Sequence, residues 1–597
     1  MRSVLTIICL VATMLGAPAV AQQACPILVV ATNDDSVNGD TSSPCALIAN
    51  PGPDGISLRE ALLAANNATG SGTITVTFAS ALAGQTIAPS SANGCCYIVS
   101  RDSVAVIGLI GPDGQPAVTV DATNMFILFS VTASNFTLQS LRIIGMGAAS
   151  PGAKTGVYVR AGDNGGELQV GNTVIEGNVF SDNPGQASGI AVVVGIAFPN
   201  AAANAVFSNA VIANNTFTNF TNVSSGGTDA VKLQAEGTNG TVQNVSILHN
   251  TFTTVTYPIE LVPAFSSGGR ILNTHIAANS FSASQTPVII DPSGDDGQPS
   301  TGNTVDGTVI ERNALTGNTG PGIMLIGGIG NGSTVSATGN AITNTTIVNN
   351  LIAGDATYGG ISIAGGRQFS SQNTVRGVNI VNNTIANYTG CNSCGGAIAV
   401  DNNLNGGTNN TVSGVAVLNT ILWNNTPLDF SGVSASQVTT SITAQAGFAG
   451  VNGNINANPQ FVSASSDFQL QSGSPARHAG TVAGAPAVDL DCQPRGSQPS
   501  IGAYEFDGPN ICPSTYSVPL TATPTSGTPP LVASAQLDRE CNVRESIARD
   551  HDILDDIICS ADPDKDTVRV ALKVAEGIAR YADVGDSGAV RTGLHAQ

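Results

Sequence analysis

Apolar and polar residues alternate in short runs along most of the chain, and one six-residue pattern returns every 29 to 37 residues. The pattern reads I-x-x-N-x-[FIL]. Its seven clear copies place the asparagine at Asn178, Asn215, Asn250, Asn279, Asn313, Asn350 and Asn383. A degenerate eighth copy holds Val417, Asn419 and Ile421. Self-similarity at this period indicates a stacked repeat architecture.

The residue types of the motif predict its conformation. The first Ile is expected to end a short strand and point inward, and the residue two positions after Asn points inward again. Asn tolerates a left-handed backbone, so we expect it to turn the chain between two strands. Asn side chains on successive coils could then form an amide ladder.

A second strand with alternating apolar residues lies between the copies, as in Gly189-Ile-Ala-Val and Ala230-Val-Lys-Leu. One repeat therefore supplies two or three short strands and loops rich in small polar residues. This predicts an all-β chain, a single-stranded right-handed parallel β-helix of about 8–11 coils. The runs at 104–107, 118–120 and 136–138 are expected to add earlier coils.

The open N-terminal end of such a solenoid needs a cap. Residues 57–66 predict a helix with a capping box from Ser57 to Glu60 and one apolar face, which suits that role. Residues 27–87, with DGISLREALLAANN, resemble the N-terminal module named for its Cys-Ser-Leu-Arg-Glu-Ala consensus on bacterial secreted β-helix proteins. Ile56 stands where that consensus has Cys, which puts its usual disulfide in doubt.

Two later segments also carry resemblances. Residues 456–506, with NANPQFVSASSDFQLQSGSPARHAG and IGAYEF, resemble the C-terminal segment of choice-of-anchor-Q surface proteins. That resemblance implies a segment that closes a β-helix of the pectin-lyase-like type. Residues 518–538 resemble the first strands of a polycystic-kidney-disease-type β-sandwich. These resemblances indicate architecture and leave activity open.

Composition narrows the class of protein. Only 10% of the 597 residues are charged, 68 are Gly, and the formal net charge is −20. So few charges argue against a helical bundle. The acidic balance argues against a nucleic-acid-binding surface, and 42% hydrophobic residues argue against acidic disorder. Charge concentrates in residues 539–597, which show helix-like patterns at 545–559 and 567–582.

The first residues predict export. Arg2, an apolar run over 4–15 and Ala19-Val20-Ala21 form a secretory signal peptide, too short in its apolar part for a membrane span. Cleavage would leave ten cysteines in a compartment that permits disulfides. Proximity suggests three pairs, although connectivity stays open: Cys25–Cys45, Cys492–Cys512 and Cys541–Cys559. Cys391 and Cys394 are interpreted as a local loop disulfide.

The predicted organisation has six parts. They are a signal peptide (1–21), an N-terminal cap module (22–96), the parallel β-helix (97–455), a closing segment (456–510), a truncated β-sandwich-like piece (511–538), and a short, atypical, charged and partly helical tail (539–597).

The outer face of the second strand column is the place to search for chemistry, by analogy with pectate-lyase-like and polygalacturonase-like enzymes. Aligned positions read Ala191, Lys232, Glu260, Ile289, Met324, Ser362 and Ala399. Lys232 and Glu260 on adjacent coils, with Asp291 on the next, are the candidate catalytic residues, since a Lys beside carboxylates could bind a uronic acid or act in acid–base catalysis. Asp229 and Tyr257 are candidate binding residues. The alternative is that Lys232 and Glu260 form a structural cross-strand ion pair.

Other candidates are weaker. His249 and His275 stand at different offsets before their Asn, so we interpret them as solvent-facing strand residues and not as a metal pair. Residues 562–566 are similar to a calcium loop but lack its Gly and its twelfth-position acid. We therefore predict no metal and no cofactor, with calcium as the weaker alternative.

The sequence thus favours a monomeric protein, secreted or on the outer surface of a bacterium, without a membrane span after signal cleavage. Its expected partner is an extracellular polysaccharide or another cell-surface polymer, and not nucleic acid. The role would be binding, adhesion or surface structure. The alternative is a polysaccharide lyase or glycoside hydrolase that acts on a polymer containing uronic acid.

Overall fold

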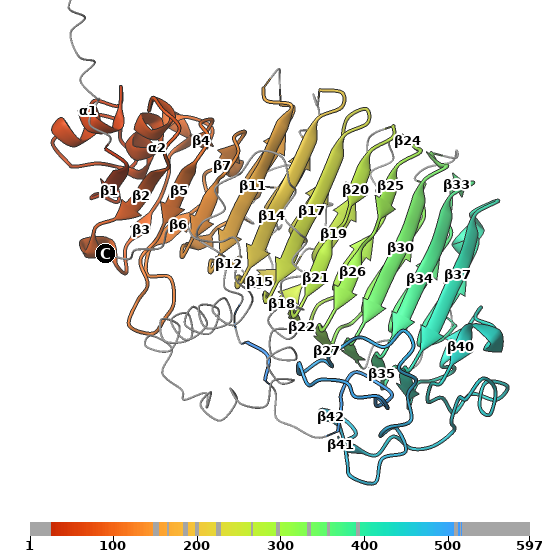
Figure 1. Cartoon of the computed structure of the whole chain (residues 1–597). Coiled ribbons are helices and arrows are strands. Elements are labelled where there is room, and N and C mark those ends of the chain that lie inside the picture. Colours follow the sequence, from red (N-terminus) through yellow and green to blue (C-terminus); the bar gives the residue numbers. More distant parts are fainter. Residues whose placement is uncertain are drawn as a thin grey trace, which may run out of the picture. The chain divides into compact units, whose positions relative to one another are not determined.

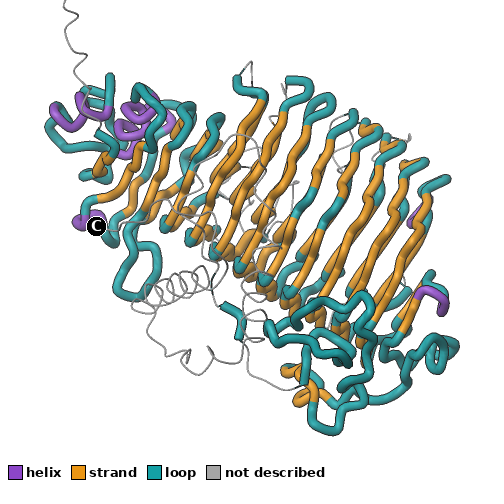
Figure 2. Tube along the Cα trace, viewed as in Figure 1, coloured by secondary structure: helices purple, strands orange, loops and turns teal. Residues whose placement is uncertain are grey.

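The structure is a computed structural model that describes residues 25–146, 154–163, 166–182, 189–196, 202–221, 229–263, 267–293, 299–330, 336–354, 359–389, 395–506, 511–513 and 515. In this part of the chain the elements are almost all strands, stacked into a parallel β-helix (Figures 1 and 2). Among the described helices, none has the length and hydropathy to cross a membrane.

Three long sheets, here called A, B and C, form the walls of the β-helix, and every strand in them pairs in parallel. Sheet A contains β1 (Ile27–Val30), β2 (Ile74–Phe78), β5 (Val104–Ile107), β8 (Thr137–Gln139), β11 (Gln169–Glu176), β14 (Val206–Ala213), β17 (Thr241–Leu248), β20 (Arg270–Leu272), β21 (His275–Ala277), β25 (Thr304–Asp306), β26 (Val309–Glu311), β30 (Ala341–Val348), β34 (Thr374–Val381), β37 (Thr411–Leu418) and β40 (Val438–Thr439).

Sheet B contains β3 (Thr86–Ile87), β6 (Thr119–Asp121), β9 (Arg142–Ile144), β12 (Val179–Ser181), β15 (Thr216–Phe220), β18 (Thr251–Val255), β22 (Ser280–Ser282), β27 (Ala314–Thr316), β31 (Leu351–Ala353), β35 (Thr384–Ala386) and β38 (Ile421–Trp423). Sheet C contains β4 (Tyr97–Val99), β7 (Ile127–Val131), β10 (Thr155–Ala161), β13 (Ile190–Ile196), β16 (Asp229–Gln234), β19 (Tyr257–Val262), β23 (Val288–Ile290), β28 (Ile323–Ile326), β32 (Ile361–Ala364), β36 (Ile398–Asp401) and β39 (Phe430–Ser431). A small sheet joins β24 (Ser300–Thr301), β29 (Ala337–Thr338) and β33 (Ser370–Ser371). The predicted fold class is therefore confirmed.

The repeated Asn stands at the corner between sheets A and B and forms the expected ladder. Asn215 Nδ2 donates to Asn250 Oδ1 at 3.0 Å, and Asn250 Nδ2 donates to Asn279 Oδ1 at 3.0 Å. In the degenerate eighth copy Asn419 adopts the left-handed conformation, as predicted (φ 49°). In the seven clear copies this Asn does not adopt it, so the prediction is wrong there. The residue before it does so, for example Asn214 (φ 57°) and His249 (φ 52°). The ladder Asn must direct its side chain into the core to reach the next coil, so the turn falls to its neighbour.

The core inside the sheets is apolar and repeats from coil to coil. The Ile and the Phe, Leu or Ile of each clear motif copy are fully buried, as predicted. The rings of Phe180, Phe217, Phe252 and Phe281 stack with centroids 4.9 to 5.0 Å apart, about one strand spacing. This column of rings therefore stabilises the same coils that the Asn ladder joins.

The N-terminal end is covered by α1 (Pro44–Ala49) and α2 (Leu58–Asn66), which lie beside the first strands in Figure 1. Ser57 and Glu60 form the predicted capping box, and the apolar face of α2 is buried. Ile56 is also buried. The Cys25–Cys45 disulfide is present, and Cys95 and Cys96 form a further disulfide that the sequence did not suggest.

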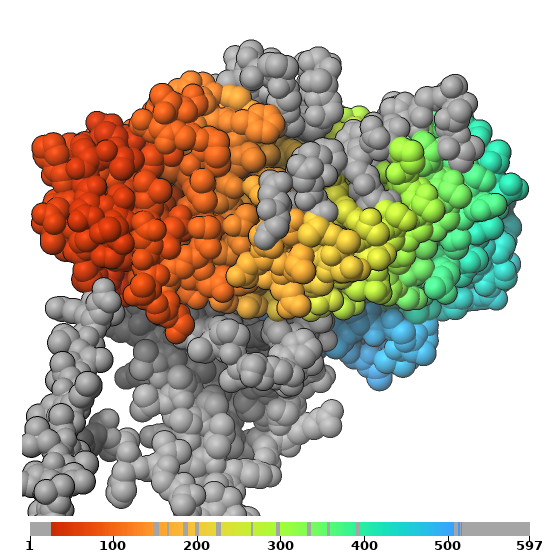
Figure 3. Space-filling view, turned by 90° about the horizontal axis from the view of Figure 1, so that it is seen from above, coloured from red at the N-terminus to blue at the C-terminus, as the bar shows by residue number. Residues whose placement is uncertain are grey.

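Residues 456–506 pack against the outside of the last coils of sheet B. Their hairpin of β41 (Phe461–Ser463) and β42 (Asp467–Leu470) joins a second apolar cluster with outward side chains of β31, β35 and β38. Asn349 Nδ2 donates to the Val488 carbonyl at 2.6 Å, and Asn382 Nδ2 donates to the Ser500 carbonyl at 3.0 Å. Figure 3 shows this segment in blue at the side of the stacked coils. The Cys492–Cys512 disulfide ties its end.

Several predicted features lie outside the described residues. They are the signal peptide 1–21, the pairs Cys391–Cys394 and Cys541–Cys559, the piece 518–538, the loop 562–566 and the tail 539–597.

Candidate functional site

The outer face of sheet C is largely apolar and carries charge near the middle of the stack. In its central column, Lys232 on β16 lies between Val193 on β13 and Glu260 on β19. The column continues through Ile289 and Met324. The charged pair is therefore bordered by apolar side chains along the helix axis.

This register corrects one predicted position. We expected Ala191 beside Lys232, but Val193 pairs with Lys232 and Gly195 pairs with Gln234. The sequence of β13, IAVVVGI, is apolar at nearly every position, so its pattern cannot fix which residues face outward. A shift of two residues keeps the same faces and leaves the alternation unchanged.

Lys232 is held between two carboxyl groups. Its Nζ is 2.9 Å from Glu260 Oε2 and 3.6 Å from Asp229 Oδ2. The side chains of Lys232 and Glu260 are 17% and 18% exposed, whereas that of Asp229 is 2% exposed. Parallel pairing of β16 and β19 places Lys232 opposite Glu260, and Asp229 begins the same strand as Lys232. Three predicted residues are thus brought together.

The electrostatics of Asp229 distinguish it from an ordinary ion-pair partner. Burial raises the pKa of Asp229 well above its usual range, the Glu260 carboxylate raises it further, and Lys232 lowers it. Neither carboxyl oxygen of Asp229 has a hydrogen-bond partner within the described ranges. Asp229 therefore keeps its proton to higher pH than an ordinary carboxyl group does, and a protonated carboxyl group can act as a hydrogen-bond donor or as a general acid.

The remaining predicted residues lie at the margin of this cluster. Tyr257 is directly opposite Asp229 in the register and is half-buried. Asp291 is one strand further along and nearly fully buried. Its Oδ1 accepts hydrogen bonds from the Ser293 backbone N–H at 2.9 Å and the Ser293 hydroxyl at 2.6 Å. That geometry gives Asp291 a structural role at the end of its strand.

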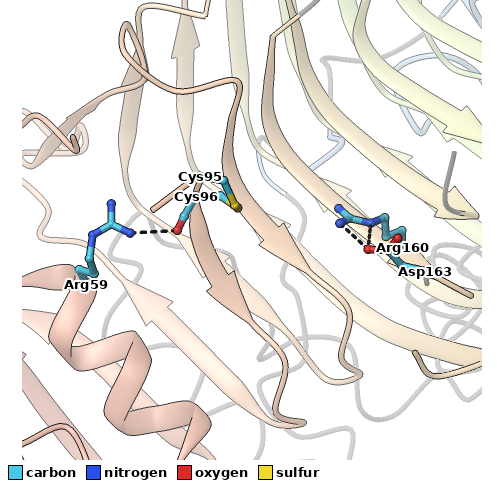
Figure 4. The surroundings of a disulfide bond; sticks show 5 residues. All are labelled: Arg59, Cys95, Cys96, Arg160 and Asp163. Atoms are coloured by element: carbon cyan, nitrogen blue, oxygen red, sulfur yellow. Dashed lines mark hydrogen bonds and ion pairs between the residues drawn. A yellow bond between two sulfur atoms is a disulfide. The ribbon is translucent and has the colours of Figure 1, made fainter. Parts of the chain in front are cut away.

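Sequence reasoning missed a second charged group on this face. On β10, Arg160 donates to Asp163 Oδ2 from Nη2 at 2.6 Å and from Nε at 2.8 Å (Figure 4). Its guanidinium lies over the Tyr158 ring, 4.5 Å from the centroid. The sequence held a signal for it, because Tyr158 and Arg160 alternate with buried Val157 and Val159 and so face outward.

The two histidines differ from their prediction. His275 is 1% exposed, and its Nε2 is 3.0 Å from Glu311 Oε1 on β26. His249 stands at the corner and not in a strand, where burial lowers its pKa to about 4. Both were expected to face solvent. His275 is on the outer side of sheet A and His249 is at its edge, yet His275 is buried and His249 is half-buried. The alternation of apolar and polar residues could not predict this burial.

Comparisons with known proteins place the chain only at the level of fold. No family model and no curated protein sequence matches it. The A-module of the Azotobacter vinelandii mannuronan C-5 epimerase AlgE6 is 13% identical, with 65% of this chain and 92% of that chain covered and a TM-score of 0.33. The Aspergillus tubingensis endo-xylogalacturonan hydrolase is 12% identical, with 72% and 99% covered and a TM-score of 0.35.

A PL6 alginate lyase in complex with a trisaccharide is 11% identical, with 75% of this chain and 92% of that chain covered and a TM-score of 0.32. At these identities and scores, any assignment of activity has to come from the geometry of this chain itself.

Proposed function

We propose that the protein binds an extracellular polysaccharide on the outer face of sheet C, with Lys232, Glu260 and Asp229 at the centre of the binding surface. The observation that carries the proposal is the buried carboxyl group of Asp229, whose oxygens have no hydrogen-bond partner among the described residues and whose ion-pair contact is with Lys232 at 3.6 Å. Buried polar atoms without partners are rare in folded proteins and often mark sites that a ligand completes.

The surroundings suit a sugar ligand. Buried Val193 and Ile289 flank the charged pair on either side, and half-buried Tyr257 lies opposite Asp229, where an aromatic ring can contact a sugar. Lys232 and Glu260 supply a cation and an acceptor for hydroxyl or carboxylate groups. We place the protein outside the cytoplasm, as a secreted or cell-surface protein, because both its predicted signal peptide and its disulfides fit an oxidising compartment.

Binding can be tested by affinity electrophoresis and calorimetry with polygalacturonate, alginate and a neutral xylan. Lys232→Met and Glu260→Gln are expected to weaken binding at least tenfold. Arg376→Gln, an exposed residue on the outer face of sheet A, is the matched control and should bind like the wild type. Wild-type affinity in both sheet C variants would overturn the proposed site.

A second candidate function is catalysis, favoured by the raised pKa of Asp229 next to Glu260. Acid–base cleavage of a glycosidic bond uses two neighbouring carboxyl groups, one of which has a raised pKa. Incubation with the same polymers should then release new reducing ends, or unsaturated products detected by ultraviolet absorbance. Loss of product in Glu260→Gln with unchanged polymer binding would assign catalysis. If the wild type releases no product, the catalytic function is excluded and the binding function remains.

A further inference from the structure

Arg160 carries an unused hydrogen-bond donor on the same outer face. Its Nη2 and Nε donate to Asp163, but its Nη1 is buried and has no hydrogen-bond partner among the residues that the structure describes. The side chain is 13% exposed and lies over Tyr158. Arg160 therefore presents one guanidinium edge to its own Asp and leaves the other unoccupied.

A second arginine of the chain shows what a completed arrangement contains. Arg59 also pairs with an Asp, through Nε and Nη2 to Asp35, and lies 5.0 Å from the centroid of the Tyr97 ring. Its Nη1, however, donates to the Cys96 carbonyl at 3.1 Å (Figure 4). Both arginines pair with an Asp through Nε and Nη2 and lie over a Tyr ring, but only Arg59 has an acceptor for Nη1. An acceptor from outside the chain would complete Arg160.

The strand beside Arg160 places a glycine next to it. Gly195 pairs with Arg160 on one side and Gln234 on the other. A side chain at Gly195 would collide with the Gln234 carbonyl, because its Cβ would lie 1.9 Å from that oxygen. In the adjacent column, Val193 separates Tyr158 from Lys232. In the register, the buried residues Gly195 and Val193 thus lie between Tyr158 and Arg160 on one strand and Lys232 and Gln234 on the other.

We propose that Tyr158 and Arg160 form a second subsite that binds an acidic sugar of the same polymer, with the sugar ring against Tyr158 and its carboxylate on Arg160. This inference rests on the proposed function. Arg160 lies two strands and two residues away from Lys232 in the register, which is roughly 12 Å between Cα atoms. Neighbouring units of one chain, and not a single ring, span that separation, so the polymer runs across the strands along the helix axis.

Selection of an acidic sugar at this position depends on local cations and not on the overall charge of the protein. The chain has a formal net charge of −20, so a polyanion gains little from its overall field. Selection of an acidic sugar must then come from individually placed cations. A guanidinium can hold a carboxylate through parallel N–H donors, which an ammonium cannot do.

The test compares oligogalacturonate with its methyl ester, which has the same backbone without the charge. By calorimetry, Arg160→Gln is expected to weaken oligogalacturonate binding at least tenfold and to leave methyl-ester binding unchanged. Arg160→Lys keeps the positive charge but loses the paired N–H donors, so this variant should bind oligogalacturonate as weakly as Arg160→Gln does. Asp163→Asn removes the negative charge beside the guanidinium and should strengthen oligogalacturonate binding. Arg376→Gln is the control, and thermal unfolding verifies that each variant is folded.

Opposite outcomes separate this inference from the function beneath it. If Lys232→Met loses binding while Arg160→Gln and Asp163→Asn bind both oligomers like the wild type, the subsite is wrong and the proposed function stands. If Arg160→Gln weakens both oligomers equally, charge recognition is wrong. If the wild type binds neither oligomer, or if Lys232→Met has no effect, the proposed function itself fails.

Discussion

Replacing one asparagine of the internal ladder tests how much of the stability of the β-helix depends on that corner. Asn250 is 1% exposed and makes four side-chain hydrogen bonds. Its Oδ1 accepts from the backbone N–H and from Nδ2 of Asn215, each at 3.0 Å. Its Nδ2 donates to the Ile212 carbonyl at 2.8 Å and to Asn279 Oδ1 at 3.0 Å.

The magnitude follows from which groups lose a partner. In Asn250→Ala, Asn215 Nδ2 keeps its bond to the Ile175 carbonyl, and Asn279 Oδ1 keeps the backbone N–H of residue 250. The Asn215 backbone N–H loses its acceptor and the Ile212 carbonyl loses a donor, and both residues are buried away from solvent. At about 1–3 kcal/mol for each group, the free energy of unfolding should fall by about 2–6 kcal/mol.

The matched control lies on the outer side of sheet A, where a second Asn ladder runs. Asn244 donates to Asn209 Oδ1 and accepts from Asn273 Nδ2, both at 3.2 Å, and it is half-buried with φ at 57°. Asn244→Gly keeps the left-handed backbone without strain, and water can replace both hydrogen bonds. We expect a loss below about 1 kcal/mol.

Urea unfolding followed by circular dichroism gives both free energies. The reasoning is refuted if Asn250→Ala and Asn244→Gly destabilise the protein equally, or if Asn250→Ala stays within 1 kcal/mol of the wild type, a threshold about the size of one exposed hydrogen bond.

Three further predictions concern charges and the closing segment. Glu260→Gln should lower the pKa of Asp229, because the Glu260 carboxylate raises that pKa. Infrared spectra of the carboxyl band recorded across a range of pH measure the pKa of Asp229. An unchanged pKa in the variant would contradict the prediction. Burial raises the pKa of Asp489 to about 6, so the proton stays on the folded state while the unfolded state releases it near pH 3.8. The stability contribution of this group is therefore complete below that pH and is lost as pH rises to about 6, by up to about 3 kcal/mol. Asp489→Asn should flatten the slope of stability against pH in that window, and an identical slope would count against the assignment. Replacing Cys492 and Cys512 by Ser should release the end of the closing segment to limited proteolysis while the coils stay protected; equal protease resistance would show that the disulfide is dispensable.

The sequence was sufficient to predict the repeated core and the Asn ladder, because each repeated residue contacts the equivalent residue of a neighbouring coil. Ile247, Asn250 and Phe252 each contact the equivalent residue of the next coil, so their spacing alone indicated the ladder and the core. The left-handed position escaped because it carries Gly177, Asn214 and other residue types at successive coils. Because several residue types adopt the left-handed conformation at this position, no single residue type marks it in the sequence.

The candidate site was only partly predictable for a related reason. Lys232 and Glu260 were found because they occupy one repeat position on adjacent coils. The burial of Asp229 depends on its surroundings at the start of β16, where the repeat varies, and Asp163 lies after its strand, so neither followed from the pattern.

The packing of the closing segment did have a signal. On sheet B, Thr251 and Thr253 face outward on an early coil, whereas Leu351 and Ala353 take those places later. An apolar outer face needs a cover, and the segment from residue 456 supplies it.

That lateral packing has a mechanical consequence. The closing segment crosses three successive coils through Asn349, Asn382 and Asn419 and does not sit only on the last one. A force that pulls at the C-terminal side of the β-helix is therefore shared among those coils and loads their hydrogen bonds in shear. Coils cannot peel away one at a time until the segment detaches, so this end should resist extension as a single unit.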